Sequence, residues 1–233
     1  MPRLFVPKDQ LPFITGSDVH YLKDVLRVKP SDELEIIDGS GTVYSAIVSS
    51  VHKDKIKLEI INSAKSEAEL KTKIILAQSL PKSKKMDFIV QKCTELGVSE
   101  IIPVVSERSV AKGEKSGRWQ KIAKEAAEQS GRALIPKISA LTDFKSLLKK
   151  KNEFDLALIP WELEKTNKLK AILQNSSPKN IIILIGPEGG FSSQEIEQAK
   201  AAGFIPVSLG KRILRAETAG LAILSMIMYE LDN

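Results

Sequence analysis

The strongest constraint on the fold is a run of five large apolar residues, 181–185, that ends at Gly186. A run without polar alternation is typical of a strand buried on both faces, as in a parallel sheet covered by helices. Residues 186–190 then predict a turn with little side-chain bulk, and Ser192 with Glu195 forms a capping-box pattern that starts a helix. A strand, a glycine-rich turn and a helix N-terminus in this order form a typical ligand-binding element of α/β proteins.

From residue 72 onward, strand patterns alternate with helix patterns. Strands are expected near residues 74–80, 100–105, 155–160, 181–186 and 205–209. Helices are expected near residues 84–96, 116–131, 163–174, 192–202 and 216–231, and the segment 142–151 can add another. This alternation predicts an α/β fold with a mainly parallel sheet and helices on both faces.

The first 70 residues follow a different pattern. Three β-branched segments, 34–38, 43–48 and 55–61, predict short strands, and Asp-Gly-Ser-Gly at 38–41 predicts a hairpin turn. One short helix is expected at 20–26. The pattern predicts a small β-barrel. The polar segment 63–71 is the expected linker, so we expect one domain at 1–70 and a second at 71–233.

Positive charge is concentrated in the middle of the chain. Residues 71–151 carry 18 basic and 8 acidic side chains, whereas 1–70 and 152–233 each have a net charge of −2. A concentrated basic region favours a polyanionic partner such as nucleic acid, although Lys-rich helix faces can also be merely solvated. Lys82, Lys84 and Lys85 crowd the end of one predicted strand, where they could hold an RNA phosphate or form a solvated loop.

Several classes of protein are disfavoured. The longest apolar runs are too short to cross a bilayer, and the N-terminus lacks the apolar core of a signal peptide. The single cysteine, Cys93, cannot form an internal disulfide and lies in the apolar stripe of a predicted helix, which indicates a packed thiol. Two histidines and one cysteine, widely separated, provide no metal-ligand pattern. We therefore expect a cytoplasmic protein without a membrane anchor and without a metal.

The glycine-rich turn does not match the common phosphate or dinucleotide motifs. It lacks the Lys-Ser/Thr of a P-loop, and its glycines do not have Gly-x-Gly-x-x-Gly spacing. Neither histidine lies in the predicted α/β part, which disfavours a Ser-His-Asp set. The remaining interpretation is a backbone cradle made by two neighbouring loops, 186–191 and 209–219.

Five motifs in combination resemble one family. They are Pro-Arg-Leu-Phe-Val at 2–6, Gln-Lys-Cys-Thr-Glu-Leu-Gly at 91–97, Gln-Ser-Gly-Arg at 129–132, Gly-Pro-Glu-Gly-Gly-Phe-Ser at 186–192 and Leu-Gly-Lys-Arg-Ile-Leu-Arg-Ala-Glu-Thr-Ala at 209–219. Over essentially its whole length the chain resembles the 16S ribosomal RNA uracil-N3 methyltransferases of the SPOUT class.

The resemblance implies a PUA-like β-barrel that binds RNA, followed by a trefoil-knotted α/β domain that binds S-adenosylmethionine. It also implies a homodimer, which agrees with the almost entirely apolar sequence of 216–231, since a helix apolar all round must be buried. The residues implied in cofactor binding are Pro160, Trp161, Glu162, Ile185, Gly186, Pro187, Glu188, Gly189, Gly190, Leu209, Gly210, Arg212, Ile213, Leu214, Thr218 and Ala219.

For methyl transfer to uracil N3 the base must first lose a weakly acidic proton. Arg215 is the candidate for stabilising the negative charge that results, because arginine stays protonated. Glu217 is the candidate proton acceptor, and Glu188 is a second one; either carboxylate could instead cap a backbone amide or orient Arg215. The expected RNA contacts are Arg3, Lys23, Arg27, Lys82, Lys84 and Lys85.

Two alternatives stay open from the sequence. An enzyme of the same class could methylate another RNA base or a ribose. A protein of a different class could keep the fold as an RNA-binding module without catalysis. The presence of both loops together with Arg215 counts against the second alternative.

Overall fold

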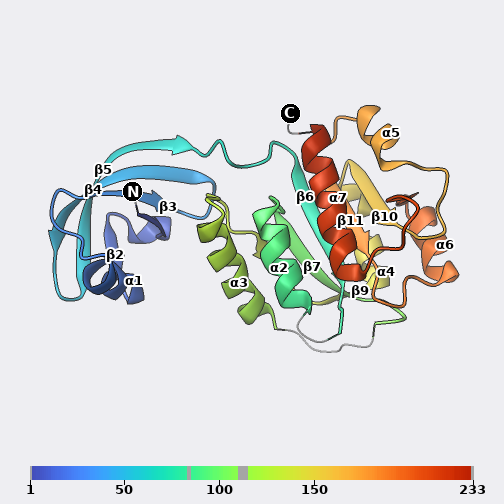
Figure 1. The fold of residues 1–233 in the computed structure, drawn as a ribbon, viewed down its shortest axis with the longest axis horizontal. Helices are drawn as coiled ribbons and strands as arrows, with labels where there is room; N and C mark the ends of the chain where they lie inside the picture. Colours follow the sequence, from blue (N-terminus) through green and yellow to red (C-terminus); the bar gives the residue numbers. More distant parts are fainter. Residues whose placement is uncertain (1, 83–84, 110–114, 232–233) are drawn as a thin grey trace. The chain divides into compact units, whose positions relative to one another are not determined.

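The computed structural model describes residues 2–82, 85–109 and 115–231. Lys84, an expected RNA contact, lies outside these residues. The chain divides into two compact units, which are drawn in Figure 1. The first unit comprises residues 1–69 and 127–135, and the second comprises 70–126 and 136–233. The chain therefore passes between the units three times.

The first unit is built on a five-stranded sheet in the order β1-β3-β4-β5-β2. Its strands are β1 (Arg3–Phe5), β2 (Phe13–Thr15), β3 (Glu33–Ile37), β4 (Thr42–Val51) and β5 (Lys55–Lys65). β1 pairs with β3 in parallel, and the other neighbours are antiparallel. The three predicted strands correspond to β3, β4 and β5. β5 runs through residues 63–65, because Lys65 pairs with Thr42, so the expected linker begins later than predicted.

The turn between β3 and β4 forms as its residue types predict. The Asp38 carboxylate accepts hydrogen bonds from the backbone N–H groups of Ser40 and Thr42, and Gly39 and Gly41 have φ values of 79° and 91°. Burial alone would raise the pKa of Asp38, but the hydrogen bonds from the Ser40 hydroxyl, from these two N–H groups and from Tyr44 hold that pKa below its usual value. The side chain therefore provides partners for the backbone groups that the tight turn leaves unpaired.

The single helix expected at 20–26 is divided in two. Helix α1 (Ser17–His20) leads into a π-helical turn (Tyr21–Val25), and Arg27 ends it with φ 55°. A 3₁₀ turn, Lys8–Gln10, precedes β2. Leu22 is the buried anchor of this region, and it belongs to the core of the unit together with Leu34, Ile36 and Ile56.

The second unit contains a parallel sheet in the order β12-β10-β11-β6-β7-β8, with β9 also pairing with β7. Every recorded pairing in it is parallel. The strands are β6 (Lys73–Ser79), β7 (Glu100–Val105), β8 (Lys137–Ile138), β9 (Thr142–Asp143), β10 (Leu156–Pro160), β11 (Asn180–Ile185) and β12 (Ile205–Val207). The apolar run is β11, which lies between β10 and β6 as a buried parallel strand.

Alternate residues of the central strands serve two separate cores. On β11, Ile181, Ile183 and Ile185 pack in one core, whereas Ile182 and Leu184 pack in the other. Helices α2, α3, α5 and α7 cover the first face, and α4 and α6 cover the second (Figure 1). Burial on both faces explains why these strands have no polar alternation.

The helices are close to their predicted positions, with one exception. They are α2 (Lys85–Glu95), α3 (Ser116–Gln129), α4 (Phe144–Leu148), α5 (Leu169–Gln174), α6 (Ser193–Ala201) and α7 (Ala216–Leu231), with a 3₁₀ turn at Lys151–Glu153. The helix expected at 163–174 begins only at Leu169. The prediction of a helix over 163–168 is wrong. The Glu164 carboxylate accepts from Thr166 N and Asn167 N and so stabilises a turn there.

Helix α7 is not buried on all sides within this chain. Ile223, Leu224 and Ile227 are fully buried, whereas Met226 and Tyr229 are 43% and 76% exposed. The prediction that a second subunit covers this helix is therefore neither confirmed nor contradicted. The trefoil knot likewise stays a prediction.

Candidate functional site

A cavity of about 510 Å³ lies at the carboxyl ends of β10, β11 and β12. Most of its lining comes from three chain segments, 160–162, 185–191 and 208–216, and Lys85 and Ala219 complete it. In a parallel sheet the strand ends and the loops after them meet at one edge, and ligands bind there. The two loops that the sequence predicted to be neighbours thus share one cavity.

The first loop is a tight turn anchored by an aromatic ring. Gly190 N donates to Pro187 O at 2.9 Å, and Gly190 has φ 66°, a left-handed conformation that favours glycine. A Cβ added to Gly186 would lie 3.1 Å from the Phe191 ring, so glycine lets the ring lie against the backbone. Phe191 is buried and packs on Phe144 with the ring centroids 5.8 Å apart.

Helix α6 starts directly after this loop, as the capping-box pattern predicts. The Ser192 hydroxyl accepts from Glu195 N, and the Glu195 carboxylate accepts from Ser192 N at 3.0 Å. Both residues are buried. The capping box is confirmed, and it fixes the direction in which the chain leaves the cavity.

The second loop presents exposed backbone to the cavity. The N–H groups of residues 211–215 donate no hydrogen bond to any other residue in the described ranges. Gly210 has φ 118°, and no atom lies within 4 Å of a Cβ added there. Ile213 is 84% exposed, an unusual position for a large apolar side chain. Unpaired amides beside apolar surface suit a ligand with both polar edges and flat apolar faces.

Lys85, which lines the cavity, lies beside the carboxylates of Glu188 and Glu217. Its Nζ lies 3.1 Å from Glu188 Oε1 and 3.3 Å from Glu217 Oε2, the latter without hydrogen-bond geometry. The hydrogen bond to Glu188 raises the pKa of Lys85; burial opposes this, and Glu217 adds to it. Burial alone would raise the pKa of Glu188, but the backbone N–H groups of Glu188 and Lys82 and the Lys85 ammonium hold that pKa below its usual value.

All residues predicted to bind the cofactor line this cavity except Thr218. Arg215 also lines it, is exposed and makes no ion pair with another described residue. Glu217 does not line the cavity, although its carboxylate reaches Lys85, which does. Apart from Arg215, the lining residues that were not named individually as cofactor contacts are Lys85, Phe191, Ser208, Lys211 and Ala216. Phe191, Ser208, Lys211 and Ala216 lie within or next to the two predicted loops, so proximity alone could have found them.

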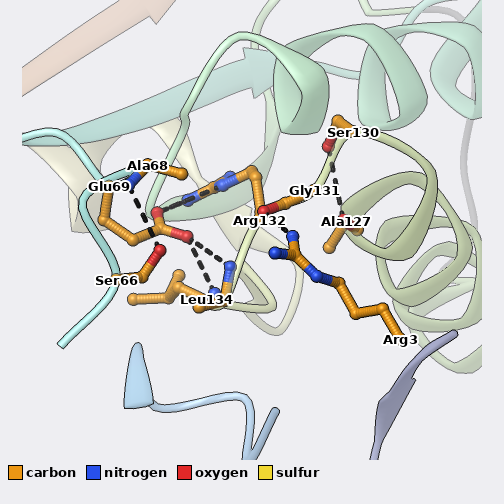
Figure 2. A network of polar contacts seen from close by, with 10 residues as sticks. Arg3, Ser66, Ala68, Glu69, Ala127, Ser130, Gly131, Arg132 and Leu134 are labelled. Atoms are coloured by element: carbon orange, nitrogen blue, oxygen red, sulfur yellow. Dashed lines mark hydrogen bonds and ion pairs between the residues drawn. The ribbon is translucent and has the colours of Figure 1, made fainter. Parts of the chain in front are cut away.

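Arg3, an expected RNA contact, is engaged inside the first unit. Its guanidinium donates to Gly131 O, as Figure 2 shows, and it also forms an ion pair with Glu35. In the same network the buried Arg132 pairs with Glu69 at 2.7 Å. Glu69 also accepts from the backbone of residues 133 and 134. The Gln-Ser-Gly-Arg motif thus contributes to packing of the first unit, as does Arg3.

Three of the other expected RNA contacts are exposed. Lys23 and Arg27 lie on the surface of the first unit, and Lys82 is exposed on the second. Tyr21 and Val25 in the same segment as Lys23 are 46% and 62% exposed. Together with Lys23 and Arg27, this segment therefore exposes basic, aromatic and aliphatic side chains.

The remaining expectations concern the Cys93 thiol, metal binding and membrane-spanning helices. Cys93 is fully buried, and burial raises the pKa of its thiol, so it is a packed side chain. Within residues 2–82, 85–109 and 115–231, no group of three or more His, Cys, Asp or Glu residues could hold a metal ion. No helix in these same ranges is long and apolar enough to span a membrane.

Comparison of the chain with known families identifies the class of protein. A family model described as an RNA methyltransferase domain matches residues 68–228, and one described as an RNA methyltransferase PUA domain matches residues 14–61. The fold class predicted from the sequence, a parallel-sheet α/β domain preceded by a PUA-like domain, is confirmed.

Individual relatives identify the family within this class. The ribosomal RNA small subunit methyltransferase E of Bacillus subtilis (strain 168) is 36% identical, over 94% of this chain and 90% of the relative. That of Mesomycoplasma hyopneumoniae (strain 232) is 37% identical, over 97% and 98%. The Neisseria gonorrhoeae enzyme, solved bound to S-adenosyl methionine, is 35% identical with a TM-score of 0.89, over 99% and 98%. This chain belongs to the ribosomal RNA small subunit methyltransferase E family.

Proposed function

We propose that this protein transfers a methyl group from S-adenosylmethionine to N3 of a specific uridine in 16S ribosomal RNA. The observation that carries the proposal is the shared cavity of the two loops, lined by almost all the residues that the sequence predicted to bind the cofactor. The relatives named for methylation of small-subunit ribosomal RNA support the substrate class. The choice of N3 depends on the resemblance in the sequence motifs.

The residues present fit the cofactor. The cavity is in the range of roughly 300–1,000 Å³ that is usual for small-molecule sites. Unpaired N–H groups at 211–215 can bind the polar edge of an adenine, and Leu209 and Ile213 offer apolar surface to its faces. Glu162 lines the cavity without a hydrogen bond to another described residue and can accept one from a hydroxyl or ammonium group.

When bound, S-adenosylmethionine supplies an electrophilic methyl group, so the protein mainly positions the reactants and stabilises charge. The Arg215 guanidinium lines the cavity without an ion-pair partner among the described residues, and it is suited to the negative charge that develops on the uracil oxygens. Glu217, whose carboxylate lies beside Lys85, stays the first candidate for accepting the N3 proton, directly or through water, and Glu188 stays the second. Glu188 is held by Lys82 N and Lys85, which lowers its pKa and makes it a weaker base.

For RNA binding we assign Lys23 and Arg27 on the first unit and Lys82 on the second. Tyr21 and Val25 add an aromatic ring and aliphatic surface on which unpaired bases can stack. Arg3 is left out, because its guanidinium already has two partners within the unit. The target base must be unpaired or flipped out, because N3 is hydrogen-bonded in a duplex.

The assembly and topology of the family are part of the same proposal. The exposed Met226 and Tyr229 of α7 are suited to a homodimer interface, and the second unit carries the trefoil knot around the cofactor. Functionally, residues 1–70 form the RNA-binding domain and 71–233 the methyltransferase domain. The expected site of action is the cytoplasm, where ribosomal subunits are assembled.

Loss of the gene tests the substrate. Nucleosides from 16S ribosomal RNA of a deletion strain are analysed by mass spectrometry, and N3-methyluridine is expected to disappear and to return with the wild-type gene but not with Arg215→Ala. Persistence of N3-methyluridine together with loss of another methylated nucleoside would support the alternative of a different base or ribose. An unchanged set of nucleosides would support the non-catalytic alternative.

A further inference from the structure

The segment 106–109, directly after β7, contacts the glycine-rich loop from outside the cavity. We propose that Arg108 and Glu107 are positioning residues that hold residues 186–192 in the shape that binds the cofactor. Neither residue lines the cavity. The proposal depends on the proposed function of this loop as part of the cofactor site.

Arg108 fixes the middle of the loop. Its Nη1 donates a hydrogen bond of 2.8 Å to Gly189 O, 81 residues further along the chain. Its aliphatic stem also lies on the same residue, since a Cβ added to Gly189 would be 3.4 Å from Arg108 Cβ and 3.5 Å from Cδ. These are ordinary van der Waals distances, so the stem packs against Gly189, which has no left-handed φ. Arg108 therefore restrains the carbonyl between Glu188 and Gly190.

Glu107 fixes the end of the loop. Its Oε2 accepts from Ser192 Oγ at 2.7 Å, and its backbone N donates to Glu195 Oε1 at 2.8 Å. The Glu195 carboxylate thus accepts two backbone N–H groups, one from the capping box and one from Glu107. Because Ser192 and Glu195 are buried, these bonds are shielded from water and hold their geometry.

The segment that makes these contacts is itself hydrogen-bonded into a turn. Ser109 Oγ accepts from Ser106 N at 3.1 Å and lies 2.9 Å from Ser106 Oγ, and Ser109 N donates to Ser106 O at 3.0 Å. Ser106 is buried at the end of β7. A braced turn on a sheet strand can therefore position the loop of a second strand without moving itself.

A positioning role for Arg108 makes a different prediction from a role in the stability of the whole fold. Arg108 is exposed, so its loss should leave global stability nearly unchanged while the loop 186–192 becomes more mobile. A more mobile loop must be ordered on binding, which weakens affinity for the cofactor. The readouts are therefore amide hydrogen exchange of residues 188–191 in the ligand-free protein and calorimetric affinity for S-adenosylmethionine, each beside a melting temperature.

Three variants are compared with the wild type: Arg108→Ala, Arg108→Lys and Arg118→Ala. Arg118 is the matched control, because it is also an exposed arginine with a hydrogen-bonded guanidinium, but its partner is Asp87 on α2 instead of the glycine-rich loop. Arg108→Ala should exchange faster at 188–191 and bind S-adenosylmethionine about three- to tenfold more weakly, as expected for the net contribution of one solvent-exposed hydrogen bond. Arg108→Lys should recover part of both, and Arg118→Ala should match the wild type.

Wild-type exchange and affinity in Arg108→Ala would overturn the proposal. So would an equal loss in Arg118→Ala, or a fall in melting temperature large enough to account for the faster exchange. If the wild-type protein bound no S-adenosylmethionine, the proposed function would fail. Exchange in the ligand-free protein would then still decide whether Arg108 restrains the loop.

Discussion

Replacement of Gly190 by alanine tests whether the shape of the glycine-rich loop determines cofactor affinity. Gly190 has φ 66°, and a left-handed conformation costs a non-glycine residue about 1–2 kcal/mol. A Cβ there would lie 3.1 Å from Glu162 Oε1, but this atom ends a flexible side chain that can move away at little cost. Backbone strain therefore dominates the expected effect. The ligand-free loop of Gly190→Ala can relieve this strain by leaving the binding shape, and the strain then returns on binding. Since about 1.4 kcal/mol corresponds to a tenfold change, Gly190→Ala should bind S-adenosylmethionine roughly 5- to 30-fold more weakly.

The assay is isothermal calorimetry with S-adenosylmethionine, and the matched comparison is Gly189→Ala. Gly189 has no left-handed φ, and a Cβ there would make ordinary contact with Arg108 at 3.4 Å. Gly189→Ala should therefore lose clearly less affinity than Gly190→Ala. Equal losses in the two variants, or an unchanged affinity in Gly190→Ala, would refute the reasoning from backbone conformation.

Three further predictions concern single side chains. Arg215→Ala should lower turnover on the order of 10²-fold and keep its affinity for S-adenosylmethionine, whereas an equal loss of both would make Arg215 a cofactor ligand. Glu188 has a lowered pKa, so its stabilising effect should be complete above about pH 4.5 and disappear as the pH falls through the folded-state pKa. The difference in melting temperature between wild type and Glu188→Gln should accordingly shrink in acid, and a difference that grows there would contradict the sign. Asp143 caps α4 by accepting from Ser146 N, so Asp143→Ala should lower the free energy of unfolding by about 1 kcal/mol in urea denaturation, with Asp143→Asn much closer to wild type.

The strands and helices of the second unit could be predicted because their signals are local. The unbroken apolar run of β11 and the capping box of Ser192 and Glu195 depend only on neighbouring residues. The order of the strands could not be predicted, since nothing in the sequence of β6 says that it lies beside β11, more than 100 residues later. That the segment 127–135 belongs to the first unit could not be predicted either, because the ion pair between Arg132 and Glu69 joins residues that are far apart in the sequence.

In the candidate site, too, features with a local sequence signal could be predicted and contacts between distant residues could not. The loops 186–190 and 209–214 could be located from glycines after apolar strands and from the family resemblance. Lys85 was assigned to RNA from local charge, yet its ammonium lies between two carboxylates that are more than 100 residues away in sequence. Arg108 carried no signal of its own, because a hydrogen bond to a backbone carbonyl leaves no pattern in residue types.

Methyl transfer by the purified protein is the most direct test of the central claim. Small ribosomal subunits from a strain that lacks the gene are incubated with the protein and S-adenosylmethionine that carries an isotopically labelled methyl group. The 16S ribosomal RNA is then digested to nucleosides and analysed by mass spectrometry. The account predicts label in N3-methyluridine, dependent on the wild-type protein and greatly reduced with Arg215→Ala. Label in any other nucleoside, or none in the presence of folded protein that binds S-adenosylmethionine, would contradict it.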